Sequence, residues 1–153
     1  MKRALFILLS CVIQAHAASS PKTPLFGDGI FVGMEPMPGY HDPLTPKDRW
    51  FHQNTLTIKG RDATLSKSPV SYNNGRKSYS ASDGGFYTYR GAVNFSGGQW
   101  QLVLLLIGSD YVARPIDKDG KPIPPKPQRF TITRMKDGSL QIGEVTYRRS
   151  KSK

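Results

Sequence analysis

The sequence has a single cysteine among its 153 residues, and this residue, Cys11, lies in an apolar stretch near the start of the chain. If that stretch is removed, the remaining chain has no disulfide, no thiol nucleophile and no thiolate metal ligand. Histidine is nearly as scarce, with His16, His41 and His52 as the full set. The domain is therefore expected to be held together by packing alone.

Helical periodicity is also missing. After residue 50 no apolar stripe repeats at the i, i+3, i+4 and i+7 spacing of an amphipathic helix. The N-terminal apolar stretch covers only residues 4–13, whereas a membrane-spanning helix needs about 20 apolar residues. We therefore expect an all-β protein that is not transmembrane.

Residues 1–17 have the order of a secretory signal peptide. Lys2 and Arg3 precede the apolar stretch, and residues 15–17 (AHA) supply the small residues of a cleavage site. We expect cleavage after Ala17 and a periplasmic or secreted protein. Lipid attachment at Cys11 is the alternative, because LLSC resembles a bacterial lipobox, but the apolar stretch before it is only about six residues long, shorter than usual.

Positive charge is concentrated in the later part of the chain. Without residues 1–17 the chain has 20 basic against 11 acidic residues, and residues 51–153 carry 17 of these basic and seven of these acidic residues. Such a surplus attracts acidic proteins, anionic glycans and lipid headgroups, although it also serves solubility alone. Nucleic acid suits the charge equally well, but export makes it an unexpected partner.

Proline divides the chain into an arm and a domain. Residues 18–50 hold six of the twelve prolines, which prevents a helix and favours an extended arm with a short strand at residues 30–33. The arm is apolar enough to pack on the domain. We expect a β-barrel domain over residues 51–149 and a basic tail over residues 150–153.

The domain itself reads as short alternating segments separated by turn sequences. Residues 73–75 (NNG), 97–98 (GG) and 136–139 (KDGS) contain the Asn and Gly that tight hairpins require. About eight to ten strands result, in a single antiparallel meander that closes into a small lipocalin-like barrel or forms a sandwich. A phase shift of the apolar residues at Gly143 predicts a β-bulge, which favours closure.

At the level of architecture this pattern is comparable to lipocalin-like barrels and to bacterial periplasmic inhibitors of lysozyme, without a motif specific to either. Segment 99–107 (QWQLVLLLI) places its even-numbered apolar residues on a core face. Its other face ends in Val103, Leu105 and Ile107, which we expect the arm to cover. The long apolar run favours a filled core over a lumen.

Segment 79–91 (YSASDGGFYTYRG) is the strongest aromatic cluster. In an extended strand Tyr87 and Tyr89 share one face and Arg90 lies on the other. Packing explains most of these tyrosines, but Tyr and Arg are also enriched at binding hot spots. The proline-rich loop of residues 114–129 adds exposed lysines. The candidate binding residues are Tyr87, Tyr89, Arg90, Lys118, Lys121 and Lys126.

Catalytic motifs are absent. The sequence has no nucleophile elbow, P-loop or dinucleotide fingerprint, and the set Asp28, Glu35, His41, Asp42 and His52 matches no known metal-ligand spacing. We therefore expect no cofactor and no catalytic residue. The favoured hypothesis is an exported binding protein that inhibits an acidic protein, such as a toxin or an envelope enzyme. The alternatives are a barrel carrier or sensor for a small ligand or an anionic glycan or lipid, and, more weakly, a hydrolase that uses His41 or His52.

Overall fold

The computed structural model describes residues 24, 26–40, 43–78, 85–110 and 116–151. The expected signal peptide, with Cys11 and Ala17, lies outside the described residues, as does His41. In the described part of the chain, no helix has the length and apolar character needed to span a membrane.

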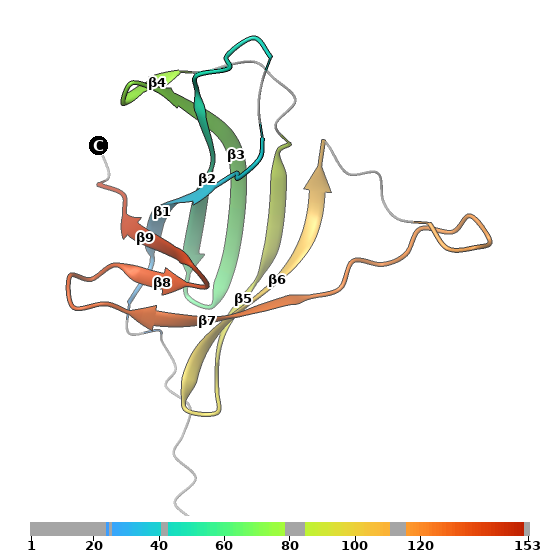
Figure 1. The fold of residues 1–153 in the computed structure, drawn as a ribbon. Coiled ribbons are helices and arrows are strands. Elements are labelled where there is room, and N and C mark those ends of the chain that lie inside the picture. The colour runs from blue at the N-terminus through green and yellow to red at the C-terminus, as the bar shows by residue number, and fades with distance from the viewer. Residues whose placement is uncertain (1–23, 25, 41–42, 79–84, 111–115, 152–153) are drawn as a thin grey trace, which may run out of the picture.

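The described residues form nine β-strands and no helix, which confirms the all-β prediction (Figure 1). The strands are β1 (Gly29–Pro36), β2 (Arg49–Lys59), β3 (Asp62–Asn73), β4 (Arg76–Ser78), β5 (Tyr87–Ser96), β6 (Gln99–Ser109), β7 (Gln128–Arg134), β8 (Leu140–Ile142) and β9 (Val145–Arg149).

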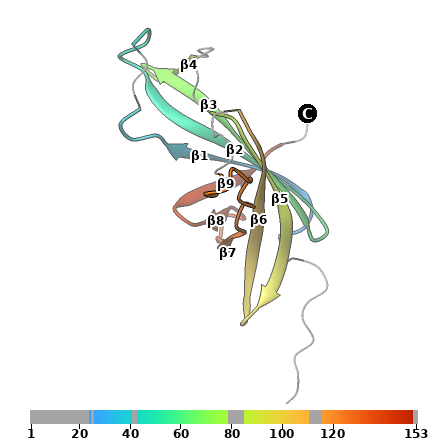
Figure 2. The same ribbon diagram turned by 90° about the vertical axis from the view of Figure 1, so that its right-hand side faces the viewer.

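Eight of these strands close into an antiparallel, lipocalin-like barrel. The strands follow the order β2-β1-β9-β8-β7-β6-β5-β3-β4, and an additional pairing between β2 and β3 closes the ring. Strand β4 pairs with β3 outside the ring. The two ends of the molecule differ, since the β3–β4 end and the β5–β6 turn point in opposite directions (Figures 1 and 2). Because the pairing of β2 with β3 closes the ring, the architecture is a barrel and not a sandwich.

Tight turns form at the Asn and Gly positions that the sequence indicates. In the β3–β4 turn Asn74 and Gly75 have φ values of 47° and 77°, and in the β5–β6 turn Gly97 and Gly98 have 59° and 77°. Two consecutive positive φ values define the hairpin turn whose twist matches that of the flanking strands. These turns fix the register of the hairpins.

The prediction of a β-bulge at Gly143 is wrong. Ile142 and Val145 are paired across β8 and β9, and Gly143, with a φ of 58°, lies in the turn between them. The phase shift therefore comes from a change of strand. The register shift of the barrel occurs instead where β5 pairs with β6, between Thr88 and Tyr89.

Residues 29–36 of the proline-rich segment form a strand of the barrel, hydrogen-bonded to β2 and β9. This position is four strands from β6 in either direction around the ring, so it cannot cover the outer face of β6. Leu105 and Ile107 are accordingly 36% and 45% exposed. The expectation that the arm covers them is wrong, because backbone pairing takes β1 into the opposite wall.

Aromatic packing fills the barrel near the β5–β6 turn. The Trp100 ring packs edge-on against Phe95 and Phe26, with centroids 5.2 and 6.0 Å apart. The guanidinium of Arg149 lies 4.8 Å from the centroid of the Phe31 ring and donates hydrogen bonds to the carbonyl oxygens of Phe26 and Asp28, both at 2.6 Å. These contacts close this end of the barrel.

Candidate ligand-binding cavity

The interior of the barrel changes from apolar to polar along its strands. Alternate residues of a strand share a face, so Leu56 and Ile58 point inward together with Asn54. The same alternation places Glu35 of β1 in phase with buried Phe31, and Lys67 of β3 in phase with buried Leu65. Polar side chains from three neighbouring strands therefore meet inside the barrel, away from the closed end.

A cavity of about 450 Å³ opens at this polar end. Its mouth includes the exposed residues Gln128 and Glu144. Its walls are mostly apolar and come from five strands: Leu65, Leu102, Leu104, Phe130, Ile142 and Val145. The volume lies in the range of small-molecule sites, which are typically about 300–1,000 Å³. The expectation of a filled core holds for the closed end and fails here.

A hydrogen-bonded network of four side chains forms the polar wall of this cavity. Lys67 Nζ forms an ion pair with Glu35 Oε2 at 2.6 Å. Asn54 Nδ2 donates to the same oxygen at 3.0 Å and to the Tyr147 hydroxyl at 3.1 Å. All four residues line the cavity. Asn54 thus ties β1 and β9 together from its position on β2.

The members of the network differ in exposure. Asn54 is 1% exposed, whereas the side chains of Lys67 and Glu35 are 21% and 37% exposed. The ion pair is therefore the most accessible part of the network. Asn54 and Tyr147 are its buried members. A carboxylate and an ammonium together offer an acceptor and a donor without net charge.

The pKa values of the network follow from these contacts. Burial by itself raises the pKa of the Glu35 carboxyl, but the hydrogen bonds from Asn54 and Lys67 and the charge of Lys67 outweigh it, so this pKa lies below its ordinary value. Burial raises the pKa of Tyr147 to about 12, partly offset by the bond from Asn54 and reinforced by the Glu35 charge. Glu35 is thus ionised and Tyr147 is neutral over the physiological range.

One atom of the network is unsatisfied. The side-chain oxygen of Asn54 is buried and has no hydrogen-bond partner in the part of the chain that the structure describes. A buried unpaired acceptor costs about 1–3 kcal/mol. Leucine would avoid this cost but would leave Glu35 Oε2 and the Tyr147 hydroxyl without the bonds that the amide donates.

The structure separates the residues that the sequence singles out. Tyr89 is 8% exposed and belongs to the core, and Tyr87 packs against the same core. Burial raises the pKa of Tyr89, with smaller contributions from Tyr87 and Glu35. Arg90 is exposed on the outer face of β5, paired with Thr64 and Leu105. The two tyrosines and the arginine therefore do not form one surface.

The other sequence candidates lie apart from the cavity. Lys118, Lys121 and Lys126 are exposed in the loop before β7, where Ile116 and Pro122 form a short bridge. His52 is half-buried on β2, with its ring centroid 5.6 Å from that of Tyr87. Among the described residues, no group of three or more His, Cys, Asp or Glu side chains is placed to hold a metal ion.

Sequence reasoning missed Asn54, Lys67 and Tyr147 as a set, and it considered Glu35 only as a metal ligand. A signal for two of them is present, because Asn54 is in phase with buried Leu56 and Lys67 with buried Leu65. A polar residue in phase with a core stripe indicates an interior polar group. Their mutual contact depends on barrel closure, which the pattern does not specify.

No protein-family model matches the chain, and no curated protein or solved structure matches it either. The interpretation of the cavity therefore depends on its own geometry.

Proposed function

We propose that this protein binds a small amphipathic molecule in the barrel cavity, as a carrier or sensor exported from the cell. The observation that supports this most directly is an open cavity of about 450 Å³ with apolar walls and a single polar wall. Small-molecule sites commonly combine such walls with a few convergent polar groups that orient the ligand. The export is inferred from residues 1–17, which lie outside the described residues.

The polar wall selects the head of the ligand. Lys67 Nζ donates and Glu35 accepts, and the two bonds that reach the Glu35 carboxylate both end on Oε2. A neutral head that both accepts and donates, such as an amide, is complementary to this pair. A charged head is less favourable, because it meets one like charge at close range.

The apolar walls select a hydrocarbon tail. Each methylene removed from water contributes about 0.8 kcal/mol before the costs of binding. We therefore expect decanamide to bind with a dissociation constant on the order of 10–100 μM. Decanoate and decylamine share the tail but carry opposite charges, so we expect each to bind more weakly than the amide.

Isothermal titration calorimetry with these three probes tests the proposal. Val145 lines the cavity and is half-buried, whereas its neighbour Thr146 is exposed. We expect Val145→Trp to weaken decanamide binding by a factor of about ten or more, since the indole occupies ligand volume. Thr146→Trp adds the same group on the outer face of the same strand and is the matched control.

A second variant tests the same cavity in case Val145→Trp does not fold. Gln128 lies at the exposed mouth of the cavity, so Gln128→Trp narrows the entrance without disturbing the core. Equal binding by Thr146→Trp and by both cavity variants would contradict the proposal, as would the failure of all three probes to bind the unmodified protein.

A further inference from the structure

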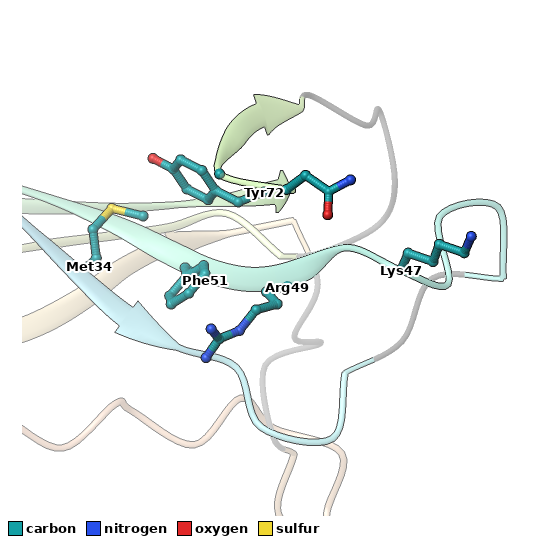
Figure 3. A pocket seen from close by; sticks show the side chains of 7 residues that line it. Met34, Lys47, Arg49, Phe51 and Tyr72 are labelled. Carbon is teal, nitrogen blue, oxygen red and sulfur yellow. The ribbon is translucent and has the colours of Figure 1, made fainter.

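A second concave surface lies on the outside of the barrel, where β2 and β3 extend past the cavity. It has a volume of about 540 Å³ and is lined by Met34, Lys47, Arg49, Phe51, Tyr72, Asn74 and Gly75 (Figure 3). We call this surface the outer groove. In Figure 3 the side chains of Met34, Phe51 and Tyr72 lie toward one end and Lys47 at the other, with Arg49 between.

Strand register explains why these residues gather. Arg49 pairs with Tyr72 across β2 and β3, and Tyr72 pairs with Lys77 across β3 and β4. Directly paired residues of an antiparallel sheet point to the same side, so two cations flank one tyrosine. Phe51 packs edge-on against Tyr72, with centroids 5.8 Å apart. The floor of the outer groove is thus aromatic and one side is basic.

The acidic residue in this stretch is turned away from the groove. Asp48 lies between Lys47 and Arg49 in sequence, but it is only 9% exposed and accepts a 2.7 Å hydrogen bond from the buried Ser71 hydroxyl. Lys47 and Arg49 are exposed. Neither belongs to the ion pair between Lys67 and Glu35. The groove therefore presents positive charge that is not neutralised by its own lining.

From this charge complementarity we infer that the outer groove docks an extended acidic segment of a partner protein. The segment carries a carboxylate for Arg49 and Lys47, and an apolar side chain for the surface formed by Met34, Phe51 and Tyr72. In an extended chain residues i and i+2 lie on the same side, about 7 Å apart. The recognised pattern is therefore Glu-x-Leu, with the intervening residue turned to solvent.

This site differs from the sequence-based hypothesis in its residues. An acidic partner was expected at Arg90 and the lysines of the loop before β7, whereas those side chains lie on other parts of the surface. The inference is also independent of the barrel cavity, since the outer groove shares none of the cavity's lining residues.

Fluorescence anisotropy with a labelled peptide (Glu-Ser-Leu-Ser)₂ tests the inference. We expect saturable binding that is lost when Gln replaces Glu and weakened when Ala replaces Leu. Arg49→Gln should weaken binding about fivefold, in line with a solvent-accessible charge-assisted contact. Arg90→Gln removes the same charge from another outer face and should leave the affinity within about twofold, because only long-range steering changes.

Three results would overturn the inference. Equal losses in Arg49→Gln and Arg90→Gln would indicate nonspecific attraction to a basic protein. Absence of peptide binding by the unmodified protein would do so as well. Binding of vesicles of anionic phosphatidylglycerol that depends on Arg49, without peptide binding, would assign the surface to a membrane. Val145→Trp should leave peptide binding intact, so failure here and failure of the cavity proposal are distinguishable.

Discussion

Replacement of Tyr147 by Phe should change how the free energy of unfolding depends on pH under alkaline conditions. The phenol is 4% exposed, and burial raises its pKa from 10.0 to about 12. The unfolded chain releases this proton near pH 10 while the folded chain retains it, so stability is fully present below pH 10 and falls as the pH rises towards 12. At 1.36 kcal/mol per unit, the loss in the unmodified protein is about 1.4 kcal/mol by pH 11.

Tyr147→Phe should be less stable than the unmodified protein at neutral pH but should not lose stability through this phenol at alkaline pH. At neutral pH Tyr147→Phe removes the acceptor of one bond from Asn54 Nδ2, which keeps its bond to Glu35, so the variant should be less stable by about 0.5–1.5 kcal/mol. Above pH 10 the variant escapes the ionisation penalty of this phenol. The difference between the two proteins should therefore shrink and vanish near pH 11.

Urea denaturation followed by tryptophan fluorescence at pH 8, 9, 10 and 11 measures this convergence. Tyr72→Phe on the outer face is the matched control, since it removes a phenol outside the network. If the unfolding free energies of the unmodified protein and Tyr147→Phe stayed parallel up to pH 11, burial would not hold this phenol in its neutral form.

Two further predictions concern the barrel wall and the ion pair. Gly91→Ala should destabilise the fold by about 3 kcal/mol or prevent folding, because a Cβ added at Gly91 would lie 1.8 Å from the carbonyl oxygen of Val103. Gly108→Ala is the control, since the nearest atom to a Cβ added there is 4.0 Å away. We expect the control to leave the midpoint of thermal denaturation nearly unchanged. Lys67→Met should raise the pKa of Glu35, measured by carboxyl NMR titration, since Lys67 contributes both a hydrogen bond and a charge that lower it; an unchanged titration would count against the ion pair.

The sequence predicts the strands and turns of this protein well because both depend on local chemistry. Period-two alternation and Asn-Gly or Gly-Gly turns act within a few residues, and the hairpins at Asn74 and Gly97 form as expected. The core face of β6 is also as predicted, with Trp100, Leu102 and Leu104 buried. These features need no knowledge of the partner strand.

Features that depend on long-range pairing are not predictable in the same way. Proline density suggested an arm with one short strand at residues 30–33. The strand is present, but it spans Gly29–Pro36 and joins the barrel, because its backbone pairs with β2 and with β9 from the far end of the chain. The run LVLLLI suggested a filled interior, but only alternate residues of it point inward. The outward members, Leu105 and Ile107, contribute nothing to the core.

The candidate site illustrates the same limit. Glu35, Asn54, Lys67 and Tyr147 lie on four strands, and the contact between Asn54 and Tyr147 joins residues 93 positions apart. Each residue is unremarkable in its own segment. The aromatic segment 79–91 attracted notice because its residues are adjacent in sequence, but adjacency along a strand sends Tyr89 inward and Arg90 outward.

NMR can locate bound decanamide on the protein. If the ligand lies in the barrel, we expect intermolecular nuclear Overhauser effects between the decanamide chain and the methyl groups of Leu65, Leu104 and Val145, all of which line the cavity. We also expect a shift of the Lys67 ammonium resonance when the head group binds. Absence of binding, or contacts confined to outer-face methyl groups such as those of Leu105, would contradict the assignment of the barrel interior as the ligand site.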